Sequence, residues 1–258
     1  MRIHDTRLAR IRHAVLAGRL KSGDFSYVEQ LAWALMPTWS SKEMCGIAGG
    51  FAITGNGRIE KGTVEAMLSR MRHRGPDDEG LFVEATGRAV LGHRRLSIID
   101  LGGGHQPMFN EDRSMAIVFN GEIYNFQELR SELESFGHRF RSNSDTEAIV
   151  HLYEQYGENC VSKLKGMFAF AIWDGVNGRL FLARDRFGKK PLFYTMANGK
   201  FWFGSEFNAL CAVPDVSREL DYTALDLFLT LCYIPSPHSI LKAVRKLPPA
   251  HTMSVDER

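Results

Sequence analysis

The amino-acid sequence predicts an α+β fold in which helices and buried sheets are stacked in layers. Two segments, residues 126–136 and 146–156, repeat apolar side chains at helical spacing, and each is followed by a glycine that ends it. Other segments are short and apolar with glycine-containing turns between them, which is typical of strands. Residues 167–183 are apolar at nearly every strand position, so both faces of that sheet are expected to be covered.

The expected elements begin directly after residue 45. Strands are predicted at residues 47–53, 81–85, 89–92, 116–119, 167–173, 180–183, 192–195 and 200–204. Apolar side chains at helical spacing predict a further helix at 63–72 and a last one at 220–231. Four prolines between residues 235 and 249 then interrupt any regular pattern, so we interpret residues 214–258 as a linker that opens another domain.

Composition places the chain among ordinary globular proteins. Of its 258 residues 44% are apolar and 24% are charged, which excludes a disordered chain. No apolar run approaches the roughly 20 residues that span a bilayer, so no membrane partner is expected. The formal net charge of +2 lacks the basic surplus of a nucleic-acid-binding protein, so no nucleic acid is expected either.

Residues 1–43 differ in pattern from the rest of the chain. They are rich in arginine, and they lack the continuous apolar stretch of about 7–15 residues that a secretory signal needs. Met44 stands directly before Cys45. We interpret residues 1–43 as an N-terminal extension, either a removable leader or the product of an over-long gene prediction.

The four cysteines are sparse and irregularly spaced. None belongs to a C-x-x-C pair, so neither a zinc site nor a dithiol redox site is predicted, and we expect no metal. Such cysteines fit a reducing compartment, so a cytoplasmic location is expected. Cys160, Cys211 and Cys232 are expected to be small buried hydrophobic residues. Cys45 differs because it stands in the first of several short motifs.

Six motifs occur in an order that chance explains poorly. They are Met-Cys-Gly-Ile at 44–47, His-Arg-Gly-Pro-Asp at 73–77, Arg-Leu-Ser-Ile-Ile-Asp at 95–100, Asn-Gly-Glu-Ile-Tyr-Asn at 120–125, Ser-Asp-Thr-Glu at 144–147 and Gly-Met-Phe-Ala-Phe at 166–170. From Cys45 to about residue 212 the chain resembles the glutaminase domain of glutamine-hydrolysing asparagine synthetase, a class II glutamine amidotransferase. The resemblance implies a glutamine amidotransferase type 2 domain over residues 45–213, folded as a four-layer αββα sandwich of the N-terminal-nucleophile hydrolase type.

The resemblance makes Cys45 the expected nucleophile. Only a few per cent of a free cysteine, with a pKa of about 8.5, is thiolate near pH 7, so the thiol needs a base. A free α-amine, with a pKa of about 7.7–8, could serve if Cys45 were the first residue, but an amide nitrogen could not. The alternative is a buried structural thiol at the start of a strand.

Negative charge that develops on the attacked carboxamide oxygen needs hydrogen-bond donors. By resemblance, the side-chain amide of Asn120 and the backbone N–H of Gly121 form this oxyanion hole. A glycine lets its backbone approach the substrate closely, because it has no Cβ. The alternative for this Asn-Gly pair is a type I′ hairpin turn.

A glutamine substrate also needs a cation for its carboxylate and anions for its ammonium group. Arg95 matches the family's carboxylate-binding arginine, although the neighbouring Arg94 leaves the register open. Backbone groups near Leu96 and Ile98 are expected to line the pocket. A solvated surface charge is the alternative for Arg95.

Two acidic residues match the positions that hold the ammonium group in the family. These are Glu122 and Asp145. The alternative is a surface charge for Glu122, and a helix N-cap or first-turn acid for Asp145. Arg74 is expected near the site with less weight, whereas Arg184, Asp185, Ser205 and Glu206 are assigned to scaffold or interdomain contacts.

The expected reaction is hydrolysis of L-glutamine to glutamate and ammonia through a cysteine thioester. In the family the ammonia passes to a synthetase domain, in cis or in trans, that uses ATP and magnesium. The pyrophosphate loop of that domain does not occur in this sequence, so no cofactor is expected in this chain, which resembles the glutaminase half only. The alternatives are a sugar or natural-product acceptor, or a catalytically silent module with Cys45 blocked. Whether the chain forms a homodimer stays open.

Overall fold

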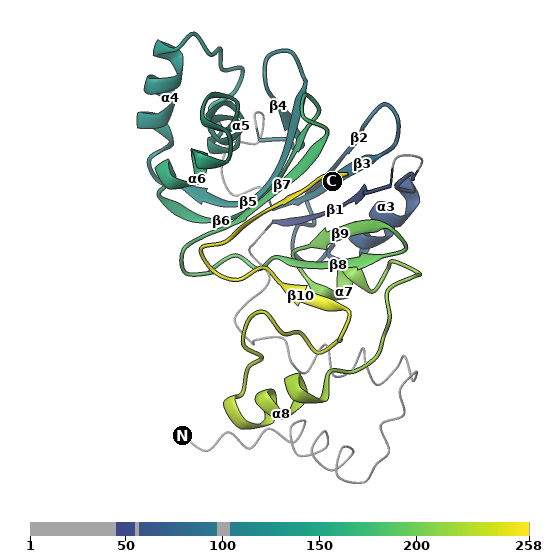
Figure 1. The fold of residues 1–258 in the computed structure, drawn as a ribbon. Helices are drawn as coiled ribbons and strands as arrows, with labels where there is room; N and C mark the ends of the chain where they lie inside the picture. Colours follow the sequence, from purple (N-terminus) through teal and green to yellow (C-terminus); the bar gives the residue numbers. More distant parts are fainter. Residues whose placement is uncertain (1–44, 55–56, 97–103, 258) are drawn as a thin grey trace.

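The computed structural model describes residues 45–54, 57–96 and 104–257, and its strands form two antiparallel sheets (Figure 1). Sheet A contains, in spatial order, β10 (Val244–Lys246), β8 (Phe193–Ala197), β9 (Lys200–Gly204), β1 (Gly46–Ala52), β3 (Ala89–Arg95) and β2 (Asp78–Val83). Sheet B contains β11 (Thr252–Val255), β7 (Arg179–Arg184), β6 (Gly166–Asp174), β5 (Met115–Ile123) and β4 (Met108–Phe109). Neighbouring strands are antiparallel in every one of these pairs.

An apolar layer fills the space between the two sheets. Its members come from alternate positions of the central strands, among them Ile47, Phe51, Ala89, Leu91, Ala116, Val118, Ala169 and Ala171. Side chains alternate between the two faces of a strand. Odd-numbered residues of β1 and β3 and even-numbered residues of β5 therefore point between the sheets, and their neighbours point outward.

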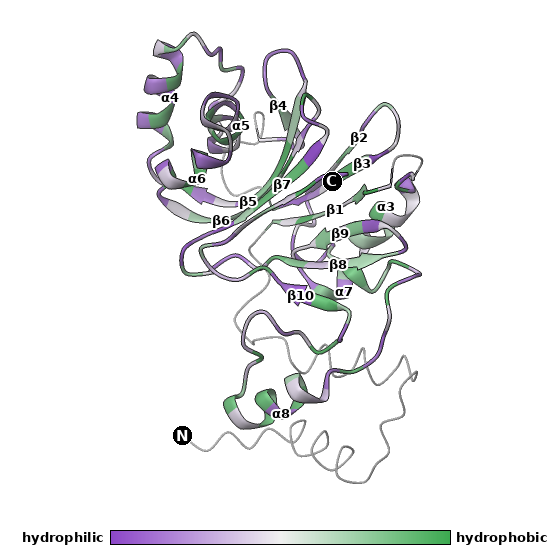
Figure 2. Cartoon of the chain, viewed as in Figure 1, coloured by the Kyte–Doolittle hydropathy of each residue, from purple (hydrophilic) through white to green (hydrophobic). Residues whose placement is uncertain are grey.

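Helices cover the outer face of each sheet. On sheet A, α3 (Lys61–Arg70) and α7 (Phe207–Leu210) share one hydrophobic cluster with outward residues of β1 and β3. On sheet B, α4 (Phe126–Ser135), α5 (Asp145–Tyr156) and α6 (Cys160–Lys163) share another. The short 3₁₀ turn η2 (Gly157–Asn159) joins α5 to α6. The layers run helices, sheet A, sheet B, helices. Figure 2 shows the mixed hydropathy of α4, which buries only Leu129 and Leu133.

Local signals in the sequence fix the ends of α5. The Ser144 hydroxyl accepts a hydrogen bond from the backbone N–H of Thr146 at 3.2 Å, which caps the first turn. Gly157 ends the helix with a φ of +59°, a conformation that favours glycine. The predicted helix at 146–156 is therefore confirmed, with Asp145 added as its first residue.

Two strands extend beyond their predicted ends into polar sequence. β3 continues from the predicted residue 92 to Arg95, and β5 continues from 119 to Ile123. In this extension β5 still pairs with β6, with Gly121 opposite Phe168 and Ile123 opposite Gly166. Hydrophobic pattern stops where the side chains become polar, but backbone pairing does not, and both extensions carry candidate site residues.

The C-terminal part contains regular structure that the prolines conceal. β10 pairs with β8 at the edge of sheet A, and β11 pairs with β7 at the edge of sheet B. α8 (Tyr222–Leu231) contributes Leu225 to the cluster that contains α3. Residues 244–255 thus add strands to both sheets where irregular structure is expected from the sequence, and the division of the chain at residue 214 stays a prediction.

One prediction about the cysteines is wrong. Cys160 and Cys211 are buried, as expected, but Cys232 is exposed. It follows the last residue of α8 and adopts φ +61° as the C-cap, so it lies at a turn and not in the core. The N-terminal extension, residues 1–43, lies outside the described residues. Among the described residues no helix is both long and apolar enough to cross a membrane.

Candidate active site

Cys45 directly precedes β1, at the centre of sheet A. Its backbone carbonyl accepts a hydrogen bond from Arg74 Nε at 3.1 Å. Arg74 is buried and its Nη1 pairs with Glu206 Oε1 at 3.0 Å, an oxygen that also lies 3.0 Å from His73 Nε2. Burial raises the pKa of Glu206, but the contacts with His73 and Arg74 outweigh it and lower the pKa below its usual value. A buried ion pair therefore fixes the backbone at Cys45.

Strand alternation brings candidate residues from three strands into one space. An even number of positions separates each candidate from a residue that points between the sheets, so the candidates point to the same side. The pairs are Cys45 with Ile47, Arg95 with Leu91, and both Asn120 and Glu122 with Val118. All four positions lie at the same end of the layer between the sheets. Gly46 pairs with Arg94 across sheet A, which puts Cys45 beside Arg95, and β5 contacts both of these strands. Lys190 interacts electrostatically with both Cys45 and Glu122, so this end of β5 lies close to Cys45. The structure thus groups residues that the sequence separates by up to 77 positions.

Asn120 and Gly121 lie inside β5 and not in a hairpin turn. The alternative of a type I′ turn is therefore wrong. Asn120 is 1% exposed, and none of the described residues accepts a hydrogen bond from its Nδ2. A Cβ on Gly121 would lie 2.3 Å from the carbonyl oxygen of Met167, so glycine is required for β6 to pack here. The site therefore contains a buried donor that the described protein does not use.

Arg94 and Arg95 point to opposite faces of sheet A. Arg94 donates to the carbonyl of Leu68 in α3 at 3.3 Å and pairs with Glu79 at 2.5 Å, so it is engaged on the outer face. Arg95 is 8% exposed and points between the sheets, and its guanidinium packs against Gly104. Arg95 is therefore the arginine on the face of sheet A that also carries Cys45, and because it is buried the surface-charge alternative for it is wrong.

Asp145 links the start of α5 to the end of β5. Its Oδ2 accepts a hydrogen bond from the backbone N–H of Ile123 at 2.9 Å. Burial raises its pKa, three backbone hydrogen bonds lower it, and the charge of Glu122 raises it further, so the net shift is upward. Ser144 is the N-cap, which makes Asp145 a first-turn acid as well. A cation between Asp145 and the exposed Glu122 would relieve this repulsion.

Two further positions were expected to line the pocket. Leu96 follows β3 directly and is half-buried. Ile98 lies outside the described residues. Of the two residues predicted to line the pocket, the structure therefore describes Leu96 only, and their role in the pocket stays a prediction.

The sequence motifs miss three residues that the structure places around Cys45. The hydroxyl of Ser205 accepts from Ile47 N at 3.0 Å, and Glu206 holds Arg74. Lys190 is buried and interacts electrostatically with Cys45 and Glu122. Burial and the charge of Arg74 lower the pKa of Lys190. Ser205 and Glu206, expected from the sequence to be scaffold or interdomain contacts, thus hold the backbone and Arg74 beside Cys45.

Lys190 reaches this place because Asp185 folds the loop that carries it. The Asp185 carboxylate accepts from the backbone N–H groups of Phe187, Lys189 and Lys190, each at 3.0 Å. An aspartate that precedes a short glycine-containing loop is a sequence signal for such a turn. That signal predicts the turn but not which strand the lysine will face.

Comparison with known proteins identifies the family. A family model described as a glutamine amidotransferase domain matches residues 44–258. The chain belongs to the glutamine amidotransferase domain family. Two curated relatives of this domain, glutamine-hydrolyzing asparagine synthetases 3 and 1 of Bacillus subtilis (strain 168), are each 40% identical to it. The first alignment covers 215 residues, or 82% of this chain and 34% of the relative, and the second covers 217 residues, or 82% and 33%.

A solved structure supports the fold of this amidotransferase domain. The glutamine phosphoribosylpyrophosphate amidotransferase from B. subtilis, complexed with ADP and GMP, matches 66% of this chain and 43% of its own, with a TM-score of 0.55. The two are 24% identical in sequence, so this likeness concerns the fold alone. The chain spans about a third of the length of the curated relatives it matches, so the activity of a whole synthetase is not carried over here.

Proposed function

We propose that this domain hydrolyses L-glutamine to glutamate and ammonia through a thioester at Cys45. The observation that supports this most is the grouping of Cys45, Arg95 and Asn120 at one end of the space between the sheets, with Asn120 Nδ2 buried and unpaired by described residues. A nucleophile, a cation and a free donor are what attack on an amino-acid carboxamide requires. The layer order and Cys45 at the head of β1 fit the N-terminal-nucleophile hydrolase type.

The first chemical step forms a thioester and releases ammonia. The Cys45 sulfur attacks the side-chain carbonyl carbon of glutamine, and the thiol proton passes to the α-amine of Cys45 when that amine is free. The amine then returns the proton to the leaving nitrogen as the carbon–nitrogen bond breaks, giving ammonia. Water next attacks the thioester, which yields glutamate and restores the thiol. In this scheme Asn120 Nδ2 and Gly121 N–H donate to the oxyanion in both steps.

Recognition of the amino acid follows from the charges around the thiol. Arg95 presents a planar fork that can bind the α-carboxylate through two hydrogen bonds. Glu122 and Asp145 bind the ammonium group, which offsets the repulsion between these two carboxylates. An acyl amide without charged groups would offer these three side chains no group of opposite charge, so the arrangement favours glutamine over an apolar acyl substrate.

The likeness to asparagine synthetases supports a role as the ammonia-supplying part of such an enzyme. On this proposal a synthetase domain, in cis or in trans, receives the ammonia, and ATP and magnesium belong to that domain. A sugar or natural-product acceptor is the alternative, since the acceptor is chosen outside this domain.

The proposal is tested by ammonia and glutamate release from a protein that begins at Cys45. Cys45→Ala is expected to abolish release, whereas Cys232→Ala, which alters an exposed thiol directly after α8, should leave it unchanged. Release retained by Cys45→Ala would remove Cys45 from the mechanism. The full-length chain should be slower by orders of magnitude, because an amide nitrogen at residue 45 is not a base. Equal rates would show that no free amine is needed.

A further inference from the structure

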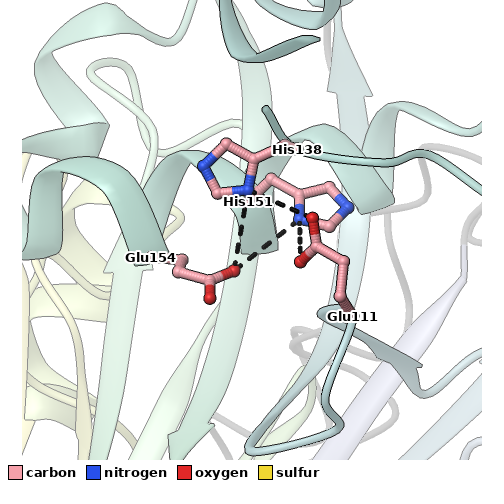
Figure 3. A group of neighbouring side chains, drawn as sticks. All are labelled: Glu111, His138, His151 and Glu154. Carbon is pink, nitrogen blue, oxygen red and sulfur yellow. Dashed lines mark ion pairs between the residues drawn. The ribbon is translucent and has the colours of Figure 1, made fainter. Parts of the chain in front are cut away.

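A cluster of two histidines and two glutamates lies near the start of β5, away from the candidate active site at the end of that strand (Figure 3). Glu111 comes from the turn between β4 and β5, His138 from the connection after α4, and His151 and Glu154 from one face of α5. One ligand atom from each of the four residues lies within 4.8 Å of the others. None of the motifs that indicate glutamine hydrolysis includes these residues.

We propose that Glu111, His138, His151 and Glu154 bind one divalent transition-metal ion of the zinc class. Four ligands at about 2.0–2.2 Å from a tetrahedral ion lie about 3.3 Å apart. Glu111 carboxylate oxygens lie 3.3 Å from His138 Nδ1 and 3.2 Å from His151 Nδ1. Glu154 Oε2 lies 3.8 Å from both of these nitrogens. All four ligand atoms lie within 4.8 Å of one another, so side-chain shifts of about 1 Å would complete a tetrahedron.

His151 supplies the independent sign of a ligand. It is 0% exposed, and neither ring nitrogen makes a well-oriented hydrogen bond to any described residue. A buried imidazole without hydrogen bonds is costly, since such groups are almost always satisfied. Its Nδ1 points toward the carboxylates of Glu111 and Glu154, as Figure 3 shows. A metal ion at that point would satisfy the nitrogen and neutralise both carboxylates.

Neighbouring residues hold both rings in the orientation a metal requires. His138 Nε2 lies 3.3 Å from Gln155 Oε1, and His151 Nε2 lies 3.6 Å from Glu147 Oε1. The His138 Nε2–H can therefore donate outward to Gln155, whereas His151 Nε2 only faces the Glu147 carboxylate at a distance too long for a hydrogen bond. In both rings the Nδ1 atom is the one that faces the cluster. Glu147 is itself fixed by the backbone N–H groups of Arg141 and Ser142, both at 2.7 Å. Carboxylate or carbonyl partners on the second nitrogen are the usual support of metal-binding histidines.

Four protein ligands make the site structural and not catalytic, because no position remains for a substrate. The ion would join the β4–β5 turn, the connection after α4 and the middle of α5. Glu154 is exposed, so it offers a path by which the ion can enter. Asp145 begins the same helix, and the ion would stabilise α5 about two turns away from the end that meets β5.

The test is metal binding by tag-free protein after removal of metal with EDTA. Zn²⁺ should bind with one ion per chain in competition with a chromophoric chelator. Cobalt should give the absorption of a tetrahedral site without a sulfur-to-metal charge-transfer band. At free zinc about 100-fold above the dissociation constant, the melting temperature should rise by about 5–10 °C. All three readouts are independent of glutamine hydrolysis.

Variants separate this site from other metal-binding groups. Glu154→Gln should weaken zinc binding by about 10-fold or more while leaving the metal-free melting temperature unchanged, because Glu154 is exposed. Glu128→Gln, an equally exposed change on α4, and Cys45→Ala should bind zinc as the parent does. Two results would overturn the proposal: a dissociation constant above about 100 μM for the parent, or equal affinity in Glu154→Gln. Either would leave the histidines as partners of carboxylates only.

Discussion

Asn120 provides the sharpest test of the proposed chemistry, because its buried side chain has a donor that no described residue uses. If Nδ2 binds the oxyanion, Asn120→Ala should lower kcat for glutamine hydrolysis by about 10²–10³, which corresponds to about 2.7–4 kcal/mol of transition-state stabilisation. KM should change little, because the interaction forms only as charge develops.

The stability of Asn120→Ala should change little, in contrast to its activity. A buried unpaired donor costs about 1–3 kcal/mol, and removing it offsets the packing lost on truncation to alanine. The melting temperature of Asn120→Ala should therefore stay within about 3 °C of the parent. Hydrolysis is measured by glutamate release, and unfolding by thermal melting of the same samples.

Asn110, which directly follows β4 at the edge of the same sheet, is the matched control. It is equally buried at 1% exposure, but its Nδ2 donates to Ser114 Oγ at 3.0 Å and its Oδ1 accepts from Met115 N at 2.9 Å. Asn110→Ala loses both bonds and leaves a buried N–H, at a cost of about 2–4 kcal/mol, and should melt about 6–12 °C lower with kcat unchanged. Equal loss of kcat in both variants, or a kcat of Asn120→Ala within 5-fold of the parent, would refute the reasoning.

Two further predictions concern neighbouring residues on β3. Arg95→Ala should raise KM for glutamine by about 10²-fold with little change in kcat, since charged hydrogen bonds contribute about 1.5–3 kcal/mol each. Arg94→Ala, which breaks the pair with Glu79, should lose about 1 kcal/mol of stability and keep the parent KM. A raised KM in Arg94→Ala and an unchanged KM in Arg95→Ala would move the carboxylate contact to Arg94. Burial lowers the pKa of His93 to about 3, against 6.5 when unfolded, so the unfolded chain takes up the proton first as pH falls. The contribution of His93 to the free energy of unfolding is therefore full above about pH 6.5 and declines toward pH 3, and about 2 kcal/mol of it is lost by pH 5. His93→Gln should flatten that decline in urea unfolding between pH 7 and pH 5, while His251→Gln at an exposed position should not; an unchanged slope in His93→Gln would contradict the assignment.

Most individual elements could be predicted from the sequence because their signals are local. Helix α5 has its capping serine, its apolar spacing and its terminal glycine within 14 residues. The strands of sheet B are apolar on successive positions because both of their faces are covered. The motif that contains Asn120 and Gly121 likewise identifies candidate residues without any structure. The Asn-Gly dipeptide by itself does not distinguish a turn from a strand, because both conformations accommodate it.

Only the tertiary structure decides which side chains share a space. Arg94 and Arg95 are adjacent and chemically identical, and the pairing of β3 with β1 and β2 sends one to α3 and the other toward Cys45. Lys190 reaches Cys45 through a loop 145 residues away along the chain. The cluster of Glu111, His138, His151 and Glu154 has no recognisable spacing, since its members come from a turn, a connection and a helix. Contacts between distant segments depend on which strands pair and on how the layers pack, and the alternation along one strand does not specify its partner.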